Sequence, residues 1–207
     1  NFLGKGIKLA SNLEVSKEAI KGKFDYTKPN FAYTENSLFT SIQATTSDYL
    51  DDFGYKVSNT GFSIGTEFEQ YENLFFSPEV SFSLEDLETN SNASTTLKKQ
   101  DGNYSNLKLD YNFFYDKRNQ SFRPSEGFYS NFSQNIPILS NSYSIYNKYD
   151  FKVYKKLSEN MIGSFSYHLS AVNSLDDGDV RISERVRLPR KRLRGFESGK
   201  IGPVDAG

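Results

Sequence analysis

Apolar and polar side chains alternate with a period of two residues along most of this chain. The clearest run is residues 76–85, in which Phe, Pro, Val, Phe and Leu alternate with Ser, Glu, Ser, Ser and Glu. Because successive side chains of a strand point to opposite faces, the pattern predicts strands with one apolar and one polar face. Pro78 lacks a ladder donor, so we expect it at a bulge or an edge.

The alternation recurs in nine segments, separated by turn-forming stretches rich in Pro, Asn, Asp and Gly. These segments are residues 6–15, 18–27, 37–48, 56–69, 74–87, 104–116, 127–137, 143–156 and 161–174. Most are longer than the usual globular strand of about 5–6 residues. They match the roughly 9–11 residues with which a tilted strand crosses a bilayer. Strand length therefore favours a membrane barrel over a soluble sandwich.

The amino-acid composition supports strands and narrows the class of protein. Aromatic residues make up 15% of the chain, with 18 Phe and 14 Tyr, and such enrichment favours strands. Mean hydropathy is -0.63 and no stretch of 18 apolar residues exists, which excludes a helical membrane protein. A β-barrel stays compatible, because alternation dilutes the average. The net charge of -1 gives no general case for nucleic acid, and the absence of Cys excludes disulfides and thiolate metal sites.

The predicted fold class is all-β: an antiparallel up-and-down meander over residues 1–207 that forms part of a transmembrane β-barrel. Bacterial single-chain barrels have an even number of strands. An open sheet in lipid would also leave two rows of unpaired backbone groups. Nine strands cannot close by themselves, so we expect an incomplete barrel.

The most specific stretch is residues 193–203, Leu-Arg-Gly-Phe-Glu-Ser-Gly-Lys-Ile-Gly-Pro. It resembles the Arg-Gly-Phe/Tyr motif of the BamA outer-membrane-protein assembly family, which continues into Ile-Gly-Pro. The resemblance implies that residues 175–207 form a long extracellular loop that folds back into the barrel lumen. A guanidinium presents five fixed donors for locking such a loop onto the wall. The implied motif residues are Arg194, Gly195, Phe196, Ile201, Gly202 and Pro203.

A second match lies between two predicted strands, where Asp116, Arg118, Pro124 and Gly127 resemble the family's Asp-x-Arg-Asp…Pro-x-x-Gly turn. Asn119 departs from the usual Asp; Asn also caps turns, but an ion pair made by that Asp is in doubt. A plain hairpin turn explains these residues better than a functional site does.

Two further landmarks set the position of the chain in the family's barrel. Residues 1–6 resemble the family's Asn-Trp/Phe-Leu-Gly-x-Gly turn, and residues 28–31 its Asn-Pro-Tyr-Phe turn. Their order implies strands three to eleven, without the first two strands, the last five and the periplasmic POTRA domains. By this assignment the long polar stretches 88–103 and 175–207 are extracellular. The turns at 27–37, 68–74, 116–127 and 156–161 are then periplasmic.

By resemblance, the function is to fold and insert β-barrel proteins into the bacterial outer membrane. Its implied partners are the lipid bilayer, unfolded barrel proteins and, through the missing periplasmic domains, assembly lipoproteins. In the family an incoming strand pairs with a weakly sealed seam by β-augmentation, and neither seam strand belongs to this chain. Two alternatives stay open: a related translocation assembly or two-partner secretion transporter, and a soluble β-sheet binding protein.

Three features have competing interpretations. The run from Arg181 to Arg194 holds seven basic residues, which suggests either a nucleic-acid patch or a loop that meets lipid headgroups or lumen carboxylates. We favour the loop and expect no nucleic-acid partner. His168, the only histidine, is predicted to face the lumen; Asp176, Asp177 and Asp179 are interpreted as a polar turn, since the spacing of a calcium loop is lacking. We expect no enzyme activity, no cofactor and no metal.

Overall fold

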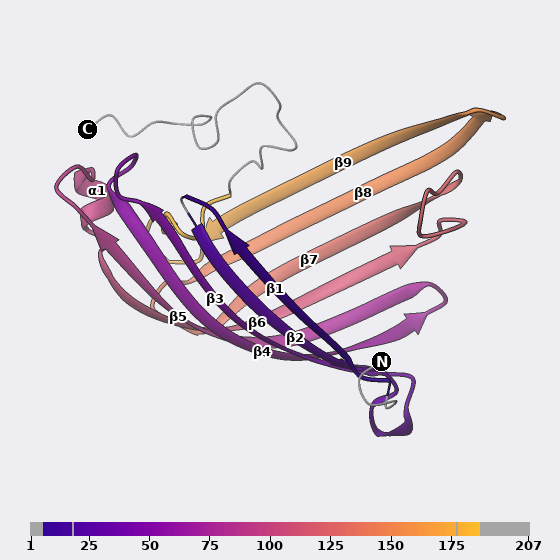
Figure 1. Cartoon of the computed structure of the whole chain (residues 1–207), viewed down its shortest axis with the longest axis horizontal. Coiled ribbons are helices and arrows are strands. Elements are labelled where there is room, and N and C mark those ends of the chain that lie inside the picture. Colours follow the sequence, from indigo (N-terminus) through magenta and orange to yellow (C-terminus); the bar gives the residue numbers. More distant parts are fainter. Residues whose placement is uncertain (1–5, 18, 177, 187–207) are drawn as a thin grey trace.

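The computed structural model of the chain describes residues 6–17, 19–176 and 178–186. Within them it forms one antiparallel sheet in which each strand pairs with its neighbours in sequence, in the order β1 to β9 (Figure 1). The strands are β1 (Lys8–Val15), β2 (Ala19–Lys28), β3 (Ser37–Tyr49), β4 (Tyr55–Tyr71), β5 (Leu74–Thr89), β6 (Gly102–Asp116), β7 (Gly127–Ser140), β8 (Ser144–Ser158) and β9 (Met161–Ser174).

The predicted fold class and meander are confirmed, and each predicted strand corresponds to an observed one. β4, β5, β7 and β8 run two or three residues beyond their predicted ends, because strand pairing continues up to the turns. Two short helices, η1 (Phe31–Tyr33) and α1 (Thr95–Lys98), lie in connections between strands. Of the helices in the described residues, none is long and apolar enough to cross a membrane.

The connections fall into two groups at opposite ends of the strands (Figure 1). One end carries α1 and the connection between β5 and β6, and residues 178–186 lie at this same end. The other end carries η1 and the turns that follow β4, β6 and β8. The sheet curls into a trough whose long edges are β1 and β9, so among the described strands these two pair on one side only.

Pro78 lies in the interior of the sheet, which corrects the expectation of a bulge or an edge. β5 pairs with β4 on one side and β6 on the other, and the register is the same before and after Pro78. Pro78 pairs with Tyr111 of β6, whereas the paired positions toward β4 stop at Glu79 and resume at Phe76. The missing N–H therefore interrupts one ladder locally without changing the register.

Very little apolar surface is buried inside the sheet. The large hydrophobic and alanine side chains that are buried in the described part of the chain are Tyr55, Leu87 and Ala93, and of these Leu87 is fully buried. They lie near the α1 end, where Tyr49 packs against Tyr55 with ring centroids 5.5 Å apart. This small cluster ties two connections together, but a soluble domain of this length would bury far more.

Candidate functional site

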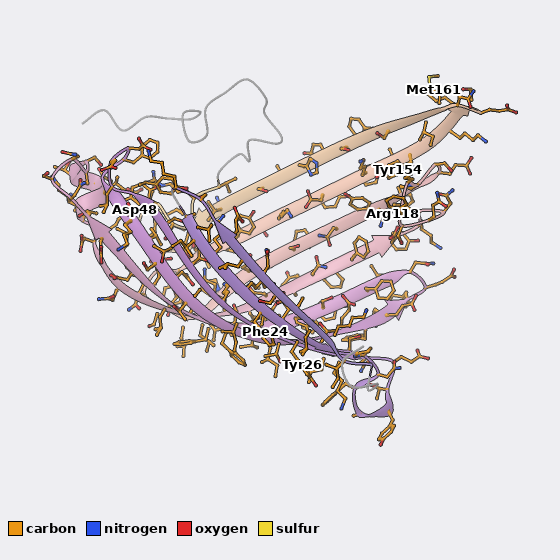
Figure 2. All side chains as sticks on the ribbon, in the orientation of Figure 1. Phe24, Tyr26, Asp48, Arg118, Tyr154 and Met161 are labelled. Carbon is orange, nitrogen blue, oxygen red and sulfur yellow. The ribbon has the colours of Figure 1, made fainter. Side chains whose placement is uncertain are left out.

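The two faces of the sheet differ in chemistry, as the alternation predicted. One row of paired residues crosses β2 to β5 through Phe24, Ile42, Phe62 and Phe82, which are 45%, 53%, 47% and 44% exposed. Phe24 and Tyr26, labelled in Figure 2, belong to this same face of β2. An apolar face this exposed would be unstable in water and is matched to lipid tails.

The next row, one residue along each strand, lies on the opposite face and is polar. It consists of Asp25, Ser41, Ser63, Ser81 and Lys108. Several side chains of this inner face bind each other: Ser81 donates to Asp110, and Asn135 donates to the same carboxylate. The inner face is therefore a continuous polar surface, as expected for a barrel lumen.

Residues 178–186, here called the return segment, fold back onto this inner face after β9. Arg181 is the most buried residue of the segment, with 3% of its surface exposed. Its Nη1 donates to Glu85 Oε1 on β5 and its Nη2 to Asn106 Oδ1 on β6, both at 3.2 Å. The guanidinium also lies 4.0 Å from the centre of the Tyr104 ring. A fork of donors and a stacked plane together fix the orientation of this side chain.

Glu184, one turn after Arg181, makes a second attachment to the wall. It lies 3.3 Å from Arg181 Nη2, accepts from Lys108 Nζ at 2.8 Å and accepts from Ser144 Oγ at 2.6 Å. Burial alone would raise the pKa of Glu184, but the hydrogen bonds from Lys108 and Ser144 and the nearby positive charges hold it below the ordinary value. The carboxylate is therefore charged while it is docked.

Two further hydrogen bonds hold the return segment against the wall. Ser183 Oγ donates to Glu85 Oε1 at 2.7 Å, and the Ile182 amide donates to Gln100 Oε1 at 2.9 Å. The segment thus touches β5, β6, the connection between them and the start of β8. We name Arg181, Glu85, Glu184 and Lys108 the anchor cluster, which holds two positive and two negative charges.

Sequence reasoning placed Arg181 in a basic run and offered lumen carboxylates as one set of partners. The structure places Arg181 against one such carboxylate, Glu85 of β5, and against Glu184 of its own segment. Glu85, Asn106 and Lys108 were missed as partners, because they look like ordinary polar-face residues of their strands. Glu184 could have been noticed as a partner of Arg181, because it is the only acid in the run from Arg181 to Arg194, but this signal is weak.

The turn between β6 and β7 brings Asp116 and Arg118 together at the opposite end of the barrel wall. Arg118 Nε and Nη2 donate to the two oxygens of Asp116 at 2.8 and 2.7 Å. The guanidinium also lies 4.8 Å from the centre of the Tyr129 ring. Figure 2 shows Arg118 at this end of the wall, close to Tyr154. The hydrogen bonds between Arg118 and Asp116 are local to the turn.

The turn accommodates Asn in place of the family's Asp at position 119, but it requires glycine at position 127. Asn119 Oδ1 accepts from the amides of Ser125 and Glu126, so it caps the turn without an ion pair. Gly127 has a φ of 90°, and a Cβ there would lie 2.0 Å from the Lys117 carbonyl oxygen. Pro124 lies between them in the loop. The residues singled out as a motif therefore build a structured turn.

His168 faces the lumen, on the same side of the sheet as its paired residue Asp150. Its Nδ1 binds the Asp150 carboxylate, whose other oxygen lies 2.8 Å from Lys148 Nζ. Asp176 accepts from Ser174 and from the Gly178 amide, which is the polar turn that the sequence indicated, although Asp177 lies outside the described residues. In the described part of the chain, no three His, Cys, Asp or Glu side chains are grouped to hold a metal ion.

The other motif residues lie outside the described part of the chain. These are Arg194, Gly195, Phe196, Ile201, Gly202 and Pro203, together with the opening residues 1–5. Their expected placement in the lumen stays a prediction. The return segment ends directly before residues 187–207, so the anchor cluster lies at the base of that stretch.

Two comparisons with known proteins match this chain. A family model described as the Omp85 superfamily domain matches residues 1–207. Among solved structures, the crystal structure of BamA from Haemophilus ducreyi lacking POTRA domains 1–3 is similar, with a TM-score of 0.83 and 22% sequence identity. The match covers 98% of this chain and 42% of that chain, so this chain spans less than half of its length. A search of curated proteins found no match.

Proposed function

Because the chain belongs to the Omp85 superfamily, we propose that it forms part of the wall of a barrel that folds and inserts other β-barrel proteins. It is an outer-membrane protein of a bacterial cell. The client proteins would be unfolded β-barrel proteins that arrive on the periplasmic side. Assembly lipoproteins would bind through periplasmic domains outside residues 1–207.

The observation that carries the proposal is the division of one sheet into a lipid-compatible outer face and a polar inner face. An outer row such as Phe24, Ile42 and Phe62 suits a bilayer, whereas the inner row suits a lumen. The two edges, β1 and β9, need further strands, because unpaired backbone groups are costly in lipid. This wall supports a role as a scaffold in membrane insertion, which needs strand pairing and no chemical step.

Residues 175–207 are proposed to form the lumen loop of this barrel. In support, residues 181–184 of this stretch contact the inner face, where Arg181 and Glu184 dock. The motif from Arg194 to Pro203 would continue from there into the lumen. Its Arg194 would bind polar residues on strands beyond β9.

The proposal is tested by reconstituting the full-length protein in liposomes and adding a urea-unfolded eight-stranded outer-membrane protein. Folded client is counted on gels as the fraction that migrates as a compact species before heating. We expect client folding to accelerate about tenfold or more over liposomes that hold an unrelated porin, because a preformed edge templates strand pairing. Equal rates in the two liposome preparations would reject the proposal.

A related translocation transporter is the second candidate, because it shares the Arg-Gly-Phe loop to which residues 194–196 are similar. The same liposomes separate the two functions. A transporter would carry an unfolded passenger across the bilayer and leave it in the opposite compartment, protected from added protease. An insertion factor would leave its client embedded in the bilayer.

A further inference from the structure

The return segment is fastened by a cluster of charges that spans elements far apart in the sequence. Arg181 reaches Glu85 of β5 and Asn106 of β6, which precede it by 96 and 75 residues. Glu184 reaches Lys108 of β6 and Ser144 at the start of β8. One short segment therefore contacts three strands of the wall, β5, β6 and β8.

Arg181 is the central residue of this bridge. Its guanidinium binds the wall through Glu85 and the segment itself through Glu184, with Nη1 and Nη2 serving different partners. Only 4% of the Arg181 side chain and 6% of the Glu85 side chain are exposed, so water screens this pair very little. Displacing either residue would leave a buried charge without its partner, and the cluster therefore favours one docked position over a range of positions.

The residues next to Arg181 add contacts to the same part of the wall. The Ile182 amide donates to Gln100, and the Ser183 hydroxyl donates to Glu85, the residue that Arg181 also binds. Arg185, four residues later, is exposed and its Nε donates to the Val180 carbonyl within the same segment. The two arginines differ in what they bind, although they share a segment.

We propose that Arg181 is a positioning residue that fixes where, and in which direction, the chain leaves the wall after β9. It acts through Glu85 and Glu184. The proposal rests on the proposed function in one respect: the segment that Arg181 positions is the lumen loop of an assembly barrel. Val186, the last residue of the return segment, is then held at a set point at the α1 end.

The test measures the position of the segment directly in the full-length protein. Residues 1–207 contain no cysteine, so nitroxide labels go on Val186→Cys and Asn92→Cys, with any cysteine elsewhere replaced by serine. Both positions are exposed, one at the end of the return segment and one in the connection between β5 and β6. Pulsed electron paramagnetic resonance in nanodiscs then gives the distribution of distances between them.

We expect a single narrow distribution in the labelled parent protein. Arg181→Met should widen it about twofold or more, because the segment loses its bridge and samples several positions. Arg185→Met is the matched control, the same substitution four residues away, and should leave the width unchanged. An Arg181→Met distribution as narrow as the parent's would overturn the proposal.

If Arg181→Met does not fold, the double variant Glu85→Gln with Glu184→Gln provides the second arm. Both changes keep the shape of the side chains and remove the carboxylates that hold Arg181. This variant should widen the distribution in the same way. A narrow distribution here would equally overturn the proposal, because Arg181 would then not act through these two residues.

A tether distinguishes positioning from a general effect on stability. Gln100→Cys and Ile182→Cys are added to Arg181→Met and bridged by a short bifunctional thiol reagent that is cleaved by reduction. Arg181→Met is expected to slow client insertion, because the segment is no longer held in one position. Bridging should return client insertion to at least about half of the parent rate, and reduction should abolish the gain, since a tether replaces the lost constraint. A bridged protein that stays as slow as Arg181→Met would contradict positioning as the role.

The two proposals fail in different ways. Client insertion by the parent protein tests the proposed function and does not involve Arg181. The label distances test the positioning role and do not involve a client. A parent that inserts nothing, but whose segment is released by Arg181→Met, would reject the function and keep the positioning role.

Discussion

Gly127 closes the turn between β6 and β7 in a conformation that other residues adopt only with strain. Its φ is 90°, and an added Cβ would lie 2.0 Å from the Lys117 carbonyl oxygen. We expect Gly127→Ala to lower the free energy of unfolding by about 2 kcal/mol or more, since left-handed backbone alone costs roughly 1–2 kcal/mol. Urea titration in lipid vesicles, read by the compact band on unheated gels, measures the loss.

Gly22→Ala is the control for this prediction. Gly22 lies within β2, and a Cβ there would meet only the Ala44 carbonyl oxygen at 3.8 Å, an ordinary contact. The control should therefore change the free energy of unfolding by less than about 0.5 kcal/mol. Equal losses in the two variants would show that the conformation of Gly127 is not what the turn requires.

Glu184 makes the docking of the return segment sensitive to acid. Burial would raise its pKa, but the hydrogen bonds from Lys108 and Ser144 and the charges of Lys108 and Arg181 hold it below the ordinary 4.5. A lowered pKa means that the carboxylate stabilises docking fully above pH 4.5 and loses this effect as the pH falls through the lowered value. We expect a nitroxide at Val186→Cys to stay immobile at neutral pH and to become mobile only below that point.

Glu184→Gln should remove most of this acid response, with Glu85 left as the carboxylate that faces Arg181. The label on the parent and on the variant is compared across the same pH series. Mobility that rises toward alkaline pH, or an unchanged acid transition in Glu184→Gln, would assign the response to another group.

Residues whose role is local were visible in the sequence, whereas residues whose role depends on distant contacts were not. Gly127 and Asn119 were predicted as turn residues from their conformational preferences alone. The partnership of Arg181 with Glu85 joins positions 96 residues apart. Glu85 alternates like any polar-face residue, so only the curvature of the sheet brings it beneath the return segment.

At the scale of the strands, the alternation predicts opposite effects for neighbouring residues. Ile42 lies on the outer face of β3 with 53% of its surface exposed, whereas Gln43 faces the lumen. We expect Ile42→Arg to lower the free energy of unfolding by about 2–4 kcal/mol, because its charge would lie near the middle of the bilayer. Gln43→Arg should lower it by less than about 1 kcal/mol. Unfolding in lipid vesicles measures both, and a larger loss for Gln43→Arg would reverse the assignment of faces.

The strands were predictable because alternation and turn residues agree along the whole chain. Where a single residue conflicts with the pattern, the pattern prevails: Pro78 lies in the interior strand β5, and the pairing toward β4 is interrupted only at Ser77 and Pro78, without a change of register. The reason for a glycine at position 65 could not be predicted from the sequence of β4 alone. A Cβ there would lie 2.4 Å from a Phe39 ring atom and 2.7 Å from the Pro78 carbonyl oxygen, so its role comes from neighbouring strands.

The whole molecule is a wall whose largest apolar surface is its outside. The apolar residues that are buried in the described chain, Tyr55, Leu87 and Ala93, are too few to hold a domain together in water. Nine paired strands keep the backbone satisfied, but the edges β1 and β9 remain open to other strands. Lipid outside and further strands at both edges are what such a wall requires.

This requirement predicts how the isolated chain behaves. Residues 1–207, refolded by dilution into buffer without detergent, should form aggregates, because the outer rows through Phe24, Ile42 and Phe62 would face water and two strand edges would be open. Light scattering after size-exclusion chromatography, with circular dichroism for strand content, measures this outcome. The partner experiment uses the full-length barrel in detergent micelles, which should be monodisperse and rich in strands, since detergent covers the outer face. If residues 1–207 elute in plain buffer as a folded monomer, the outer face does not need lipid and a soluble β-protein becomes the better description.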